Sequence, residues 1–230
     1  LTDPANVLKN AVYSLRKELC GGESSTDSPI IYSTGGYRFD PAVELDLDVD
    51  GFSALCDRAL AADGTPEERA ALCQQAVDTY RGDFLPQLDQ DLWVVPISLD
   101  YKRKYLDCAH LLCELLWQQK QYKELLDIAS TAINFEPLDE KITVYLFRAM
   151  DALKMYRVIV TTYSKMAQHY EDALGGEPPT EALKIYNAAS ERINKTEQDI
   201  IVIKTELTGS EQSARPQRGA YYTSYSNLRH

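Results

Sequence analysis

Two aspartates in the segment 81–90 are the first residues of this 230-residue chain whose types and spacing suggest chemistry. Asp83 and Asp89 could form a carboxylate pair for acid–base catalysis or a Mg²⁺ site. Either role requires a phosphate-binding loop or a nucleophile nearby, and the neighbouring sequence supplies neither. Carboxylates in loops that contain Gly and Pro more often cap helices and form turns. We therefore expect both aspartates to be structural.

The cysteines and histidines are a second candidate set, for metal binding. The five cysteines include no C-x-x-C pair, and most occupy apolar positions of helical stretches: Cys20, Cys56, Cys73, Cys108 and Cys113. They are typical of small core residues in a reducing compartment. Only three histidines are available, so we expect no metal and no cofactor. The sequence also lacks hydrolase, nucleotide-loop and zinc-protease motifs, and we expect no enzymatic activity.

The net charge of −11 is unevenly distributed along the chain. Residues 1–39 and 196–230 each balance to zero, so the whole acid excess lies between Asp40 and Lys195. An acidic surface repels a polyphosphate, and any nucleic-acid contact must therefore come from the ends. No run approaches the ~20 apolar residues that span a bilayer, and the chain opens on a helix signal without a signal peptide. We expect a cytoplasmic protein with no membrane partner.

An amphipathic helix at the N-terminus is the first stretch that suits nucleic acid. Asp3 or Thr2 can cap it, and Pro4 fits the first helical position. One face carries the apolar residues Leu8, Ala11, Val12, Leu15 and Leu19. The opposite face offers cations for phosphates, amides for base edges and an aromatic ring, from Asn6, Lys9, Asn10, Tyr13, Arg16 and Lys17. A basic helix face is more often simply solvated, so the helix alone leaves a structural role open.

A β-hairpin signal follows this helix. Gly21 and Gly22 end the helix, and residues 30–39 contain two short β segments around a turn at Gly35 and Gly36. A basic helix followed by a small hairpin is typical of the second half of a winged helix. In such a module the hairpin, here with Thr34 and Arg38 as candidates, touches the DNA backbone or the minor groove.

Two helical stretches further along repeat at a spacing of 34 residues. Leu112 and Tyr122 recur as Leu146 and Tyr156, and Pro137 follows where the first pair ends. This spacing is the period of a tetratricopeptide helix pair. It predicts one pair from 105–119 with 122–135, and a second from 140–153 with 156–174. An antiparallel helical bundle with this spacing by chance is the alternative.

Helices also flank the predicted repeats. A helix that contains Phe52 is followed by one that starts at Thr65 and Pro66. A long helix is expected from 91 to 120, in which Pro96 lies in the first turn or produces a kink. We expect the aromatic residues of the long helix to lie in the core: Trp93, Tyr101, Tyr105 and Trp117.

A closing helix is expected after the repeats. It starts at 178–181, runs to Ile193 and caps the stack, and residues 209–219 have the composition of a linker.

The N-terminal residues resemble a known family. The run 6–19, followed by Ile31, Thr34, Gly35, Gly36, Tyr37 and Arg38, looks like the recognition helix and wing of the response-regulator type of winged helix. In bacterial antibiotic-regulatory activators, that module precedes a helical bacterial transcriptional activator domain. The resemblance extends through 80–86, Trp93, the repeats and Leu174-Gly175 to about Ser190. The family's winged helix begins earlier, so here it is truncated at its N-terminal side.

The resemblance and the residue patterns together predict a mainly α fold. It is a tetratricopeptide-like helical repeat domain preceded by the recognition helix and β-hairpin wing of a partial winged helix. The expected parts are 1–40 for the winged helix, 45–195 for the activator domain, and 196–230 for a linker or tail that leads to a further domain.

The function that the resemblance implies is DNA-binding transcriptional regulation, as an activator. Double-stranded DNA would bind the N-terminal segment, and the acidic repeats would contact RNA polymerase, another copy of the chain or a regulatory domain. The alternative is a tetratricopeptide scaffold that holds a peptide segment without binding DNA.

Overall fold

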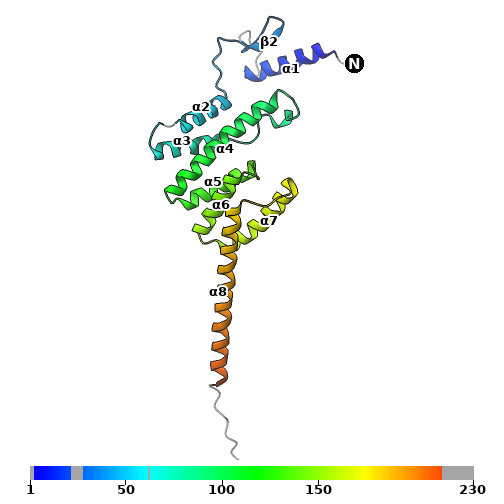
Figure 1. Cartoon of the computed structure of the whole chain (residues 1–230). Helices are drawn as coiled ribbons and strands as arrows, with labels where there is room; N and C mark the ends of the chain where they lie inside the picture. Colours follow the sequence, from blue (N-terminus) through cyan, green and yellow to red (C-terminus); the bar gives the residue numbers. More distant parts are fainter. Residues whose placement is uncertain (1–2, 22–27, 62, 214–230) are drawn as a thin grey trace, which may run out of the picture. The chain divides into compact units, whose positions relative to one another are not determined.

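The computed structural model describes residues 3–21, 28–61 and 63–213, and it divides into two compact units (Figure 1). The first unit is Leu1–Gly51 and the second is Phe52–His230. Within the described residues, a small hairpin in the first unit is the only β structure, and the rest is mainly helical. None of the described helices has the length and apolar character that a membrane span needs.

Helix α1, Pro4–Leu19, forms the main element of the first unit. The Asp3 side chain accepts a hydrogen bond from the amide of Ala5, with the donor and acceptor 3.1 Å apart, and Pro4 occupies the first helical turn. The helix ends at Cys20, and Gly21 follows with a positive φ of 69°. The predicted start and end of this helix are confirmed, whereas Gly22 lies outside the described residues.

The hairpin consists of β1, Ile30–Ser33, and β2, Gly36–Phe39. The strands are antiparallel, with Ile30 opposite Phe39 and Ser33 opposite Gly36. The predicted turn at Gly35-Gly36 is wrong by one residue, because Gly36 already belongs to β2. Thr34 and Gly35 form the turn, both with positive φ (51° and 82°), as a two-residue hairpin turn with matching twist requires.

Helix α2, Asp48–Leu60, runs across the boundary between the two units, and α3, Pro66–Thr79, follows it in the second unit. Thr65 and Glu68 form a capping box at the start of α3, in which each side chain satisfies a backbone amide. A short 3₁₀ turn, η1 (Pro86–Leu88), leads to α4, Val94–Gln118. Pro96 lies in the first turn of α4, as expected.

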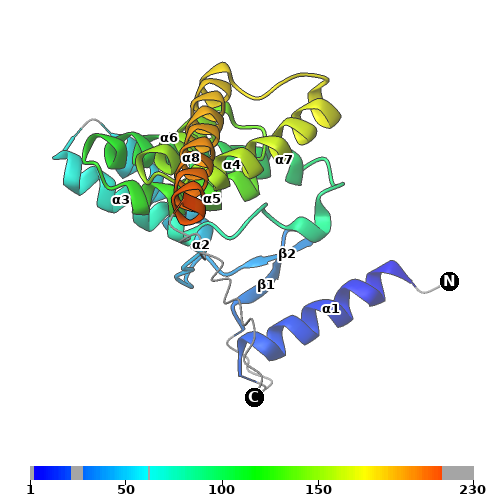
Figure 2. The same ribbon diagram turned by 90° about the horizontal axis from the view of Figure 1, so that it is seen from below.

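The two predicted helix pairs are present. Helix α4 packs against α5, Tyr122–Phe135, and α6, Glu140–Ala152, packs against α7, Tyr156–Leu174. Helix α6 also packs against α5 and α4, so the pairs stack into one layer after another (Figures 1 and 2). Leu112 and Leu146 are both buried, and Tyr122 and Tyr156 both begin the second helix of their pair. The 34-residue repeat is confirmed.

Helix α8, Thr180–Ser213, is much longer than the closing helix that the sequence suggested. It packs on α6 and α7 near its start and then extends beyond them (Figure 1). The expected linker is wrong for residues 209–213, which remain helical, while residues 214–219 lie outside the described part. A single glycine such as Gly209 costs a helix about 1 kcal/mol but does not end it.

One aromatic residue departs from the predicted core. Tyr105 is fully buried and stacks on Tyr80 at 4.3 Å between ring centroids, with Phe135 at the edge of both rings. Trp93 is instead 55% exposed. Helix α4 has 25 residues and its partner α5 only 14, so α5 does not cover the first turns of α4 or the residues before them.

Candidate nucleic-acid interface

The polar face of α1 is an exposed line of side chains. Asn6, Asn10, Tyr13 and Lys17 follow one another at helical spacing, and Lys9 lies beside Tyr13. All five are exposed. Within the described residues of the first unit, no acidic side chain forms a salt bridge with Lys9 or Lys17. The structure therefore brings these five predicted site residues together on one accessible surface.

Arg16 has a different role from the other members of that face. Its Nε and Nη2 atoms both donate hydrogen bonds to the Ile30 carbonyl oxygen, at 3.1 and 2.8 Å. Its guanidinium carbon lies 5.7 Å from the centroid of the Tyr37 ring. The side chain is half-buried between helix and hairpin. Arg16 thus holds the hairpin against α1, a positioning role that its residue type and spacing did not reveal.

The remaining two candidates, Thr34 and Arg38, belong to the hairpin and not to the exposed face of α1. Thr34 is exposed at the turn, where its hydroxyl donates to the carbonyl oxygen of Ser33 at 2.8 Å. Arg38 is exposed and lies opposite Ile31. Side chains alternate along a strand, so Arg38 lies on the hairpin face opposite to the one that carries Tyr37 and meets Arg16. The geometry places Arg38 at a flank of the α1 surface.

The apolar face of α1 is also accessible in this structure. Val12 is its only buried member within the described residues, whereas Leu8, Leu15 and Leu19 are about half-exposed. A two-stranded hairpin is too small to cover a helix of 16 residues. The apolar stripe that the sequence indicated exists, but the described part of this unit does not bury it.

A groove on the second unit is a separate candidate, for protein contact. It has a volume of about 600 Å³ and lies between α4, α6 and the start of α8. Arg148 lies between the rings of Trp117 and Tyr145, at 5.6 and 5.5 Å from their centroids, and its Nε atom donates to Glu181 at 2.6 Å. The carboxylates of Glu114 and Glu140 line the same groove.

A His–Asp pair lies at the same groove. His110 Nε2 is 2.8 Å from Oδ2 of Asp139, and Asp139 also caps α6 by accepting the amide of Ile142 at 2.8 Å. Burial opposes ionisation of this carboxylate. The hydrogen bonds from His110 and the backbone outweigh burial, and the pKa of Asp139 lies below its usual value.

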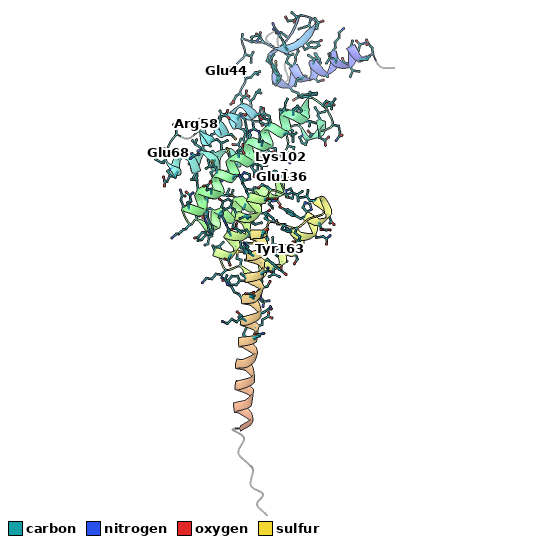
Figure 3. All side chains as sticks on the ribbon, viewed as in Figure 1. Glu44, Arg58, Glu68, Lys102, Glu136 and Tyr163 are labelled. Carbon is teal, nitrogen blue, oxygen red and sulfur yellow. The ribbon has the colours of Figure 1, made fainter. Side chains whose placement is uncertain are left out.

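Asp83, one of the two aspartates first considered for catalysis, has structural partners. It accepts from the Tyr80 hydroxyl at 3.5 Å and lies 3.8 Å from Nζ of Lys102. Lys102 also pairs with Glu136 at 3.3 Å, and both residues are labelled in Figure 3. Burial, together with the Asp83 charge, raises the pKa of Tyr80 to about 12. No group of three or more His, Cys, Asp or Glu side chains within the described residues could hold a metal ion.

The comparison with protein families decides the identity of the helical part. The model of the bacterial transcriptional activator domain matches residues 47–189. The chain belongs to this family. It is therefore a member of a family of transcriptional regulators, and its predicted resemblance to the bacterial transcriptional activator domain is confirmed.

A solved structure has a fold like that of this activator-domain chain. It is Mycobacterium tuberculosis EmbR in complex with a low-affinity phosphopeptide, with a TM-score of 0.52 and 16% sequence identity. The match covers 84% of this chain and 51% of that one, so this chain spans about half the length of EmbR. At this identity the likeness shows the fold, and it confirms the predicted fold class. No curated protein matches the sequence.

Sequence reasoning missed two surfaces of the activator domain. The 34-residue period implied stacked helix pairs but not the charges that line their groove. The sequence predicts Trp93 as a core residue, although Leu92 and Trp93 are adjacent in the chain and cannot both lie on one narrow helical stripe. That adjacency was the available signal.

Proposed function

We propose that this activator-domain protein is a DNA-binding transcriptional activator that reads DNA through α1 and the hairpin. The observation that carries the proposal is the Arg16 contact with Ile30, which fixes the hairpin to the helix and leaves the polar line of α1 exposed. A helix of this kind fits the major groove of B-DNA. We propose the same division of the chain as above: residues 1–40, 45–195 and 196–230.

Each exposed residue of α1 has a chemical role in this proposal. Asn6 and Asn10 can pair with the N6 and N7 edge of adenine, and Lys9 and Lys17 neutralise phosphates on either side of the groove. Thr34 and Arg38 at the hairpin contact the backbone or the minor groove beside the helix. The acid excess of the chain lies outside this segment, which favours DNA contact at the N-terminal end.

The acidic activator domain then serves protein contact. RNA polymerase, a second copy of the chain and a regulatory domain are the candidate partners. Contact with polymerase at a promoter raises transcription, which is why we propose an activator. The family supports this reading, since the matched domain is a bacterial transcriptional activator domain.

Salt-dependent DNA binding by the full chain tests the proposal. The probe is a duplex obtained from a random double-stranded pool by repeated selection on the protein. Lys9→Ala and Lys17→Ala should each weaken binding and lower the slope of log K against log salt by about 0.9. Asn10→Ala should relax the preference at one base pair and leave that slope unchanged.

Lys165→Ala is the matched control, because Lys165 is exposed in the middle of α7. It should change neither affinity nor slope. If the Lys9 and Lys17 variants behave like this control, α1 is not the DNA-binding face.

The groove of about 600 Å³ supports a second candidate, a scaffold that holds a peptide segment without binding DNA. A peptide array probed with the full chain separates the two. The scaffold is favoured if Glu140→Lys abolishes peptide binding and the selection yields no DNA duplex that the protein binds.

A further inference from the structure

We propose that the surface around Trp93 docks a protein whose contact area is apolar at its centre and basic at its rim. The proposal rests on the proposed function in one respect, because it names the chemistry of the partner that the activator domain contacts. The Trp93 surface is defined by six exposed apolar residues between η1 and the second turn of α4: Leu88, Leu92, Trp93, Val95, Ile97 and Leu99.

The Trp93 surface differs from scattered surface leucines in the number of exposed apolar residues that lie close together in the chain. Leu92 is 91% exposed, Leu99 61% and Trp93 55%. Single exposed apolar residues are common on soluble proteins and need no explanation. Six of them lie within twelve consecutive residues, with Val95 and Leu99 on one side of α4 and Leu92 and Trp93 just before it. A cluster of exposed apolar residues of this kind marks an interaction site.

The fold explains why these residues are free for contact. Val94 is fully buried and anchors the start of α4, so its neighbours in the chain point away from the core. The partner helix α5 covers only the later turns of α4. None of the six residues belongs to the buried core of the described part of the domain.

The charged side chains next to Leu92 are acidic. Between residues 82 and 101 the chain contains four aspartates and no Lys or Arg. Asp89 and Asp91 are exposed and flank Leu92, and Asp100 follows Leu99. Asp100 pairs with Arg103 at 2.7 Å, whereas Asp89 and Asp91 form no salt bridge within the described residues. The rim of the Trp93 surface is therefore acidic.

The acidic rim determines which kinds of molecule can bind the Trp93 surface. A second copy bound through the same surface would place Asp89 and Asp91 against their own counterparts, and like charges facing each other across an interface disfavour it. Nucleic acid and anionic lipid headgroups are repelled for the same reason. A protein that presents Lys or Arg around an apolar pocket satisfies both parts of the surface, with Trp93 and Leu92 as the central anchors.

Two synthetic helical peptides test this chemistry with the full chain. The first carries a leucine face flanked by lysines, and the second is identical except that glutamates replace the lysines. Fluorescence anisotropy should show binding of the lysine peptide, weakened by added salt, and no binding of the glutamate peptide. The double variant Leu92→Ser with Trp93→Ser should weaken binding of the lysine peptide at least tenfold.

The matched control is Leu174→Ser, since Leu174 is 63% exposed at the far end of α7. Leu174→Ser should leave peptide binding unchanged. Both this variant and the double variant should keep the thermal unfolding midpoint of the parent chain. The proposal is overturned if the lysine peptide binds the double variant as tightly as the parent chain, or if it binds neither of the two.

Two further readouts separate the alternatives. Sedimentation equilibrium that shows self-association abolished by the double variant would assign the surface to a second copy and overturn the partner proposed. DNA binding of the double variant should equal that of the parent chain. The Lys9 and Lys17 variants should lose DNA binding and keep peptide binding, so they test the proposed function. The double variant should lose peptide binding and keep DNA binding, so it tests the Trp93 surface.

Discussion

Lys120 and Lys154 lie 34 residues apart and adopt the same left-handed backbone conformation, with φ of 59° and 58°. Each follows the first helix of a repeat. The amide of the next residue donates to a carbonyl five residues earlier, from Gln121 to Leu116 and from Met155 to Met150, both at 2.9 Å. This is the Schellman way of ending a helix, and glycine is its usual residue. The repeat is thus copied in backbone geometry as well as in side chains.

Replacement of either lysine by glycine should stabilise the protein. A residue with a Cβ atom pays about 1–2 kcal/mol for the left-handed conformation, and the extra freedom of glycine in the unfolded chain offsets part of the gain. We expect Lys120→Gly and Lys154→Gly each to raise the free energy of unfolding by about 0.5–1 kcal/mol. Lys165→Gly, in the interior of α7, should lower it by about 1 kcal/mol. Urea denaturation measures all three, and a loss of stability in all three variants would contradict the assigned turn.

Removal of the Arg16 guanidinium should loosen the hairpin. Arg16→Met keeps the aliphatic stem but removes both donors to the Ile30 carbonyl oxygen. A hydrogen bond from a charged donor contributes about 1.5–3 kcal/mol, and the half exposure of this one favours the lower end. Hydrogen exchange of the hairpin amides should therefore accelerate about tenfold. Arg38→Met, on the other face of the hairpin, should leave the exchange rates as they are, and the same acceleration in both would refute the anchoring role.

The Asp139 carboxylate should make stability depend on pH. Its pKa in the folded protein is below the usual value, so its ionised form stabilises the fold above the unfolded pKa of about 3.9. That contribution is lost as the pH falls through the folded pKa. Asp139→Asn retains a good cap for α6 and removes the charge. The parent chain should exceed this variant in unfolding free energy near neutral pH, and the two should converge in acid.

Asp139→Ala is the companion variant, because alanine removes the cap as well. It should cost about 1 kcal/mol more than Asp139→Asn at every pH. If the difference between the parent chain and Asp139→Asn is the same in acid as at neutral pH, the carboxylate is not the titrating group.

The thiols should differ sharply in reactivity. Cys56, Cys73, Cys108 and Cys113 are buried, whereas Cys20 at the end of α1 is partly exposed. Burial raises the pKa of Cys113 to about 12, and a thiol rather than a thiolate is a poor nucleophile. A disulfide reagent should label one thiol quickly in the native chain and all five after unfolding.

Cys20→Ser should remove that fast phase. More than one rapidly labelled thiol in the native parent chain would show that the helices of the activator domain open more readily than their packing implies.

The sequence predicted those parts of the fold that depend on local periodicity. The α1 cap at Asp3, the capping box at Thr65 and the repeat of Leu112 at Leu146 all follow from residue types at fixed spacing. Such signals act within one or two helical turns, so a single sequence contains them fully.

Features that depend on distant elements could not be predicted in this way. Arg16 binds a backbone carbonyl 14 residues away, and every residue has such a carbonyl, so no residue type marks the contact. Trp93 is exposed because α5 is shorter than α4, which a periodic pattern in α4 alone does not encode. The candidate DNA residues on α1 were brought together by helical spacing, whereas the separate position of Arg38 followed from the hairpin register.

The length of α8 has a mechanical consequence. Its 34 residues form a rod about 50 Å long, and side-chain contacts with α6 and α7 hold its first half, from Glu181 with Arg148 to Glu197 with Arg157. The distal half is therefore a lever arm. A tilt of about 5° near Glu197 displaces Ser213 by about 2 Å, because 16 residues separate the two along the helix. Since Glu197 pairs with Arg157 of α7 at this pivot, a small shift of α7 there moves the far end of the helix.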